Sequence, residues 1–160
     1  MKWKNWLENW DMTSLKVNLK FLEMEWQPRE PDKAAAWDLY IELLTRVTTQ
    51  ALQAGQCEEK TALESVHSLF PLTREIIKRN GRGCIEFTKI AIIVLNQIIR
   101  PFTTKWHGEM LKNGFTRKSK RAEFHFELTD LQTKLTRYSK MLAQMADVED
   151  LTQFETTNSK

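Results

Sequence analysis

Apolar residues along this chain recur mostly three and four positions apart, which is the spacing of one face of an α-helix. Such stripes predict helices over Asp32 to about Ala54, about Glu58 to Phe70, Pro71 to Asn80, Gly83 to Asn113 and Arg121 to Ala146. Pro71 is expected either to start or to kink the third of these. Asp32 is suited to cap the first helix, and Gly55 and Gly81 are suited to end the first and the third. The pattern therefore predicts an all-α protein, built as a single bundle of four to five long helices.

The stretch from Gly83 to Asn113 changes character half-way along its length. Its first half is the most apolar run of the chain, so a helix there is expected to be buried on most faces. Its second half begins with Arg100-Pro101 and continues to Trp106-His107. Because the residue before a proline is disfavoured in helical geometry, Arg100 is expected at a kink or at a helix end.

The first 31 residues are expected to add a short helix and an arm to the bundle. Trp3, Trp6 and Trp10 share one face of an amphipathic helix, which would either close over the core or anchor a protein partner or a second copy. In residues 13–26 apolar and polar residues alternate at first, and the positions of the apolar residues then shift phase. A helix, an extended arm and an edge strand are therefore all compatible with this segment. No second strand is evident to pair with them, and an extended or strand-like arm is favoured. Two prolines within residues 27–31 predict a linker without helix.

Composition agrees with one helical domain. The 160 residues include only five glycines and four prolines, which disfavours a sheet of many strands. Residues 1–146 are expected to form the domain, 1–31 as helix and arm and 32–146 as bundle, before an acidic, partly flexible tail over 147–160. Cys57 and Cys84 lack the spacing of a metal site, and no apolar run is long enough to span a membrane. We therefore expect a cytoplasmic protein without a metal, a small-molecule cofactor or membrane attachment.

Charge is distributed unevenly, although the net charge is only +3. Between residues 100 and 121 seven Lys or Arg side chains stand against one acid, whereas residues 147–160 hold four acids and one lysine. Leu151 and Phe154 give the acidic tail an apolar side, with which it could fold back onto the basic segment or bind a partner. The basic segment is either a solvated linker or a contact for RNA or DNA phosphates. Its cations are Lys112, Arg117, Lys118, Lys120 and Arg121.

Arg100 and His107 are the candidate residues for chemistry. Their spacing resembles the R-x4-6-H motif of HEPN ribonucleases, although Pro101 follows the arginine where that family usually places a polar residue. The resemblance implies that two such motifs meet across a dimer, that the histidine shuttles a proton at the ribose 2′-hydroxyl and that the arginine steadies phosphate charge. The structural alternative is that Arg100 closes the core helix while Trp106-His107 packs on the bundle. His67 and His125 are expected to be core or boundary histidines.

Three segments, over residues 32–46, 68–81 and 94–107, resemble a helical module of bacterial proteins associated with conflict and antiphage-defence systems. The resemblance implies a bacterial host, an all-α fold and a role beside effector or sensor proteins. The leading prediction is accordingly a non-enzymatic interaction or assembly component of a defence complex. Its partner or second copy would bind at Trp3, Trp6, Trp10, Leu151 and Phe154. The alternatives are a HEPN-like ribonuclease that uses Arg100 and His107, and an accessory protein that binds nucleic acid.

Overall fold

The computed structural model describes residues 1–46 and 59–154, and within these ranges every regular element is helical, which confirms the predicted all-α fold. Its α-helices are α1 (Trp3–Asn9), α2 (Leu19–Leu22), α3 (Glu30–Leu44), α4 (Glu59–His67), α5 (Leu69–Asn80), α6 (Ile85–Val94), α7 (Arg100–Leu111) and α8 (Lys118–Ala146). Shorter turns connect or follow them, namely η1 (Gly81–Gly83), η2 (Leu95–Ile99), η3 (Gly114–Thr116) and η4 (Thr152–Phe154).

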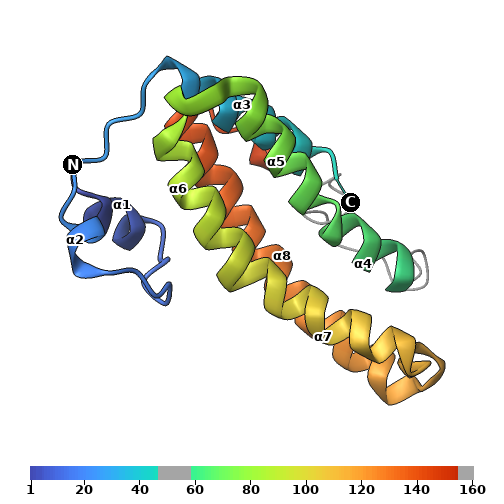
Figure 1. Ribbon diagram of the computed structural model, residues 1–160. Helices are drawn as coiled ribbons and strands as arrows, with labels where there is room; N and C mark the ends of the chain where they lie inside the picture. Colours follow the sequence, from blue (N-terminus) through green and yellow to red (C-terminus); the bar gives the residue numbers. More distant parts are fainter. Residues whose placement is uncertain (47–58, 155–160) are drawn as a thin grey trace.

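A long hairpin runs through the molecule, with α6, η2 and α7 on one side and α8 on the other (Figure 1). α3 packs against α8, α5 and α6 at one end of this hairpin. α4 packs against α7 and α8 closer to the other end. The end of the α7–α8 hairpin projects beyond α4 in Figure 1.

The apolar stripes that the sequence predicts fill the core between these helices. Trp106 of α7 and Phe124 of α8 pack edge to face, with ring centroids 5.1 Å apart. α6 is less buried than predicted, because its neighbours leave one side of it open to solvent, and Ile85 and Ile92 are each about half exposed. Core side chains from the predicted stripes include Leu39, Leu63, Ile90, Leu128, Leu135 and Leu142.

The start of α3 differs from the prediction, because the helix begins at Glu30 and Asp32 is its third residue. Pro31 therefore lies in the first turn, where its missing N–H removes no helical hydrogen bond. The Asp32 carboxylate is fully buried, and its Oδ2 accepts a hydrogen bond from the Arg29 backbone N–H at 2.8 Å. Its Oδ1 accepts from the backbone N–H of Phe87, in the first turn of α6, at 3.0 Å. One carboxylate thus satisfies backbone donors at the starts of two helices.

Arg100 is the first residue of α7, directly after the π-helical turn η2, so an α-helix begins at the predicted boundary, although the backbone stays helical through Pro101. Arg100 has φ −59° and ψ −44°, which is ordinary helical geometry. Before it, η2 is a π-helical turn, in which the Arg100 N–H donates to the Leu95 carbonyl oxygen. This wider turn accommodates a proline that has no N–H to offer.

The tryptophans of α1 close over the core instead of facing outward. Trp3 and Trp6 are 0% exposed. Trp3 Nε1 donates to Glu86 Oε2 at 2.9 Å. Trp6 Nε1 and Trp10 Nε1 both donate to Gln144 Oε1 of α8, at 2.8 Å and 2.7 Å. The prediction that these side chains form an outward anchor for a partner is wrong for Trp3 and Trp6, which are buried within this chain, whereas Trp10 is partly buried.

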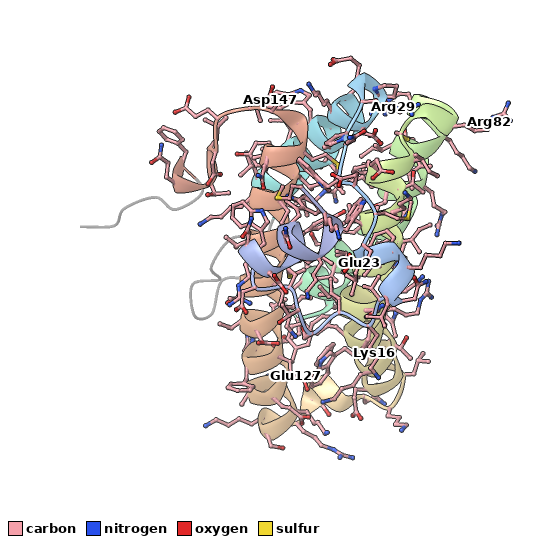
Figure 2. All side chains as sticks on the ribbon, turned by 90° about the vertical axis from the view of Figure 1, so that its left-hand side faces the viewer. Lys16, Glu23, Arg29, Arg82, Glu127 and Asp147 are labelled. Atoms are coloured by element: carbon pink, nitrogen blue, oxygen red, sulfur yellow. The ribbon has the colours of Figure 1, made fainter. Side chains whose placement is uncertain are left out.

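The arm over residues 13–26 begins with a turn and a bend over 13–15, has no regular structure over 16–18 and then forms the single turn α2. Its one β-type pairing within the described ranges is an isolated bridge between Lys2 and Glu25, so it is an arm and not an edge strand. The Lys16 backbone binds the Gln97 side chain of η2 through two hydrogen bonds, at 2.7 Å and 2.8 Å. Together α1, the arm and α2 form an N-terminal lobe, which faces the viewer in Figure 2.

The acidic tail folds back on α3, at the opposite end of the molecule from the basic segment. The Tyr40 hydroxyl donates to Asp150 Oδ1 at 3.3 Å and accepts from the Leu151 backbone N–H. Figure 2 places Asp147 near the same end as Arg29. The predicted contact between tail and basic segment is therefore wrong for residues 147–154. The expectations for Ala54, Gly55 and Cys57 and for residues 155–160 fall outside the described residues.

Candidate functional site

Arg100 and His107 lie on the same face of α7, because seven residues make two helical turns. The Arg100 guanidinium lies over the ring of Phe70 from α5, 4.8 Å from its centroid. Its Nε donates to Asn96 Oδ1 at 3.2 Å. His107 is half-buried, and its ring meets the ring of His67 edge to face, with centroids 5.0 Å apart and planes at 67°.

His67 completes this group from the last residue of α4. Its side chain is exposed, and its ring lies 5.7 Å from the ring of Phe70 as well as against His107. We call His67, Phe70, Arg100 and His107 the histidine face. The sequence carried no signal for His67, because the contact joins two helices that are distant along the chain.

Trp106 and His107 point in different directions, although they are neighbours in the sequence. Trp106 is 0% exposed, and its Nε1 donates to Glu127 Oε2 of α8 at 2.6 Å. The predicted packing of this pair on the bundle therefore holds for the tryptophan, whereas His107 borders the surface. The third histidine, His125, lies apart from the histidine face, with Nε2 3.2 Å from Glu59 Oε1 at the start of α4.

The end of the α7–α8 hairpin carries a group of exposed cations. We call Lys112, Arg117, Lys118 and Arg121 the basic end; all four are exposed, and within the described ranges none of them forms an ion pair. Lys120, which was predicted with them, lies instead 3.1 Å from Glu123 and 4.0 Å from Glu109.

A tight turn holds these cations together. Asn113 adopts a left-handed conformation with φ 56°, and a Cβ on Gly114 would come within 2.8 Å of the Glu109 carbonyl oxygen. Just outside the turn, Lys105 is neutralised by Glu123 and Glu127, at 2.7 Å and 2.6 Å. Hydrogen bonds to these two carboxylates raise the pKa of Lys105, and the hydrogen bond from Lys105 lowers the pKa of Glu123. The acids of the hairpin are therefore engaged with Lys105 and Lys120, and the charge of the basic end stays uncompensated.

Two large apolar side chains are exposed on the helices of the hairpin. Leu111, the last residue of α7, is 83% exposed, and Phe126 of α8 is 78% exposed. Phe115 is different, since its ring stacks on Trp106 with centroids 5.9 Å apart.

The predicted partner-binding residues lie mostly inside this chain. Trp3 and Trp6 are buried, and Trp10 and Leu151 are partly buried against the core. Phe154 alone among these five is largely exposed, at 73%.

Two surface grooves are further candidates for a binding site. One, of about 280 Å³, lies between the η2–α7 side of the hairpin and α8; its charged rims are already paired, Lys105 with Glu127 and Lys134 with Asp130. The other, of about 270 Å³, separates α3 from α5 and contains the Arg79–Asp38 ion pair. Hydrogen bonding to Asp38 raises the pKa of Arg79 above its ordinary value.

Comparison with known proteins leaves function to be argued from the residues themselves. No protein-family model matches the chain, and neither a curated protein nor a solved structure matches it. In residues 1–46 and 59–154, His, Cys, Asp and Glu side chains do not gather in a group of three that could hold a metal ion. None of the helices described is both long and apolar enough to cross a membrane.

Proposed function

We propose that this chain is a helical interaction module that binds single-stranded nucleic acid through the basic end of its α7–α8 hairpin. The observation that carries the proposal is the absence of ion pairs at Lys112, Arg117, Lys118 and Arg121 within the described residues. Nearby Lys105 and Lys120 each have carboxylate partners. Cations without internal partners are free to replace the counterions of a phosphate backbone.

The exposed apolar side chains of the same hairpin favour a single strand over a duplex. The exposed ring of Phe126 offers a flat surface on which an unpaired base can stack. Leu111 adds an apolar contact at the end of α7. Bases in a duplex are already stacked, and they gain nothing from such a ring unless the duplex opens.

The α7 helix extends this surface toward the histidine face. Arg100 and His107 lie on one side of the helix that ends at the basic end, and Arg100 has no carboxylate partner within the described ranges. A strand bound at the basic end can therefore continue along α7 to a further cation.

The salt dependence of binding tests the proposal. We expect a fluorescein-labelled 12-nucleotide poly(U) strand to bind, with a slope of log K against log salt of about −3 for four phosphate contacts on a single strand. Changing Lys112, Arg117, Lys118 and Arg121 to Ala should remove most of that slope. The matched control changes four exposed cations elsewhere, Lys4, Lys20, Lys78 and Arg82, to Ala and should leave it intact. Equal loss in both variants would show only a general charge effect and would contradict the proposed site.

The assembly role expected from the sequence is part of this proposal. Because the tryptophans of α1 are folded against this chain, a protein partner or second copy would use the remaining exposed side chains, Phe154 among them. Membership of a bacterial defence complex rests on the sequence resemblance and stays a prediction. Analytical ultracentrifugation of the full chain, with Phe154→Ser as the variant, tests self-association directly.

A further inference from the structure

We propose that a second copy of this chain docks its basic end against the acidic tail of the first, so that copies associate head to tail. We call Asp147, Val148, Glu149 and Phe154 the tail patch. The inference deepens the assembly role in the proposed function and rests on it, because it names a second copy as the partner and the basic end as the other half of the contact.

The two surfaces lie at opposite ends of α8. Lys118 of the basic end is the first residue of this helix, and the tail patch begins at Asp147, directly after its last residue. α8 has 29 residues and is therefore about 43 Å long. Figure 2 shows Asp147 at one end of the molecule and Glu127 of α8 toward the other. The basic end and the tail patch of one copy are thus too far apart to meet, and only a second copy can bring them together.

The charges of the two surfaces are opposite and largely unpaired. The basic end carries four cations, and none of them forms an ion pair within the described ranges. Glu149 is exposed and likewise has no ion pair among residues 1–46 and 59–154. Asp147 lies 4.0 Å from Lys33, which is closer to Glu30, at 3.3 Å. Each surface can therefore supply the counter-charges of the other.

The charges at both ends of α8 are unfavourably placed for its helix dipole. Acids are favourable at the positive N-terminal end of a helix and cations at the negative C-terminal end. The first turn of α8 contains no acid and the last turn no basic residue. Lys118 and Arg121 lie at its start instead, and Asp147 and Glu149 follow its end. Contact with the opposite end of another copy relieves both arrangements, because it places acids at the start of α8 and cations beyond its end.

Exposed apolar side chains accompany both sets of charges. In the tail patch, Phe154 is 73% exposed and Val148 is 36% exposed. At the basic end, Leu111 is 83% exposed and directly precedes Lys112. Burial of these side chains between two copies adds a hydrophobic contribution to the electrostatic attraction.

A contact of this kind is heterologous, because it joins two different surfaces. Copies that associate in this way can add one after another, until a ring closes or a chain stays open. Each surface consists of only a few side chains, so the contact is weak and transient. A nucleic-acid strand at the basic end occupies the same four cations, so the strand and a second copy compete for them.

Analytical ultracentrifugation of the full chain tests for association. Over about a hundredfold range of concentration at low salt, we expect the weight-average mass to rise beyond that of a dimer. At about 0.5 M salt it should return toward that of the monomer, because exposed charges are screened. The mass of a monomer at every concentration overturns the inference.

Two variants of the full chain identify the surfaces. One is the fourfold alanine variant of the basic end. The tail variant combines Glu149→Lys and Phe154→Ser with Asp147→Asn, since Asn tolerates the left-handed backbone at this position, where φ is 57°. Circular dichroism checks that each variant is folded. Each alone should stay monomeric, because it lacks one of the two surfaces, whereas an equimolar mixture should form dimers and nothing larger.

The mixture separates a head-to-tail contact from a symmetric one. In it, the intact basic end of the tail variant meets the intact tail of the other variant, and the altered surfaces stop further growth. A basic-end variant that still associates by itself, or a mixture that stays monomeric, overturns the inference. The control with Lys4, Lys20, Lys78 and Arg82 changed to Ala should associate as the unmodified chain does. Loss of association in this control would show a general charge effect and would also overturn the contact.

The poly(U) strand distinguishes failure of this inference from failure of the proposed function. We expect the strand to bind and to dissociate the assembly. If the strand does not bind, the proposed binding of nucleic acid is overturned, and the head-to-tail contact stands where the mixture forms dimers. If the strand saturates the chain while the assembly persists, the basic end is not part of the contact, and the inference is overturned.

Discussion

The carboxylate of Asp32 in α3 accepts a hydrogen bond from the backbone N–H of Phe87 in α6, 3.0 Å away and out of contact with water. Its other oxygen accepts from the Arg29 N–H at the start of its own helix. A negative charge placed at two helix starts interacts favourably with both helix dipoles. Glu86, the residue before Phe87 in α6, accepts from Trp3 Nε1, so α1, α3 and α6 are joined through two carboxylates.

Replacing Asp32 by Ala should therefore be among the more destabilising single changes in this chain. The variant leaves the buried Phe87 N–H and the partly buried Arg29 N–H without their acceptors, and we expect the free energy of unfolding to fall by about 2–4 kcal/mol. Urea unfolding followed by circular dichroism measures the change. Asp130→Ala is the control, since Asp130 is an exposed residue whose ion pair is with Lys134, and it should cost less than about 1 kcal/mol. A cost for Asp32→Ala as small as that would contradict the double cap.

Two glycines should respond to alanine in opposite directions. A Cβ on Gly83 would lie 2.9 Å from Cγ of Pro31, in a ring that cannot move aside, so Gly83→Ala should destabilise by about 1–2 kcal/mol. A Cβ on Gly108, inside α7, would meet no atom within 4 Å. Gly108→Ala should therefore stabilise the protein by about 0.5–1 kcal/mol through helix propensity. Thermal unfolding of both variants checks the prediction, and changes of the same sign would argue against the close approach of Gly83 to Pro31.

The tryptophans of α1 allow a direct comparison between a core role and a partner role. Trp6 is 0% exposed, and Trp6→Ala should lower the free energy of unfolding by about 3–5 kcal/mol. Trp37 of α3 is 41% exposed, and Trp37→Ala should cost clearly less. If Trp6→Ala is about as stable as the unmodified chain, Trp6 is again a candidate for partner binding.

The helical fold could be predicted because burial of one face repeats along each helix. The apolar stripe of Arg121 to Ala146 appears as α8, which begins only three residues earlier, and Gly81 follows the last residue of α5 as predicted. α5 begins at Leu69, so Pro71 lies in its first turn and not at its start. The start of α3 was missed because Asp32 resembles a cap, yet its acceptor oxygens serve its own helix from the third position and α6 from a distance. Contacts of this kind depend on tertiary packing, which a local pattern does not contain.

The candidate site was predictable only in part, for a similar reason. The spacing of Arg100 and His107 correctly indicates one face of a helix, because spacing along one helix fixes direction. The approach of His67 depends on how α4 packs against α7, and no periodicity records that. The tryptophans of α1 show another limit of prediction from sequence. Their amphipathic spacing predicts that they are buried, but it does not say whether the covering surface belongs to this chain or to another.

Tyr138 of α8 offers a final prediction, because its hydroxyl is buried without a hydrogen-bond partner among the described residues. Tyr138→Phe removes this unsatisfied group and should leave the free energy of unfolding at neutral pH unchanged or raise it by up to about 1 kcal/mol. Tyr40→Phe is the matched control, since the Tyr40 hydroxyl bonds to Asp150 and to the Leu151 N–H, and its loss should cost about 1 kcal/mol.

The two tyrosine variants should also differ at alkaline pH. Burial raises the pKa of Tyr138 above its ordinary value of 10, so the folded chain keeps a proton that the unfolded chain releases. Stability of the unmodified chain should therefore fall as pH rises above 10, by about 1.4 kcal/mol per pH unit from this group. Tyr138→Phe lacks the group, so its advantage over the unmodified chain should widen between pH 10 and 11 in urea unfolding. A constant difference across that range would mean that the hydroxyl reaches water or a partner in the folded protein.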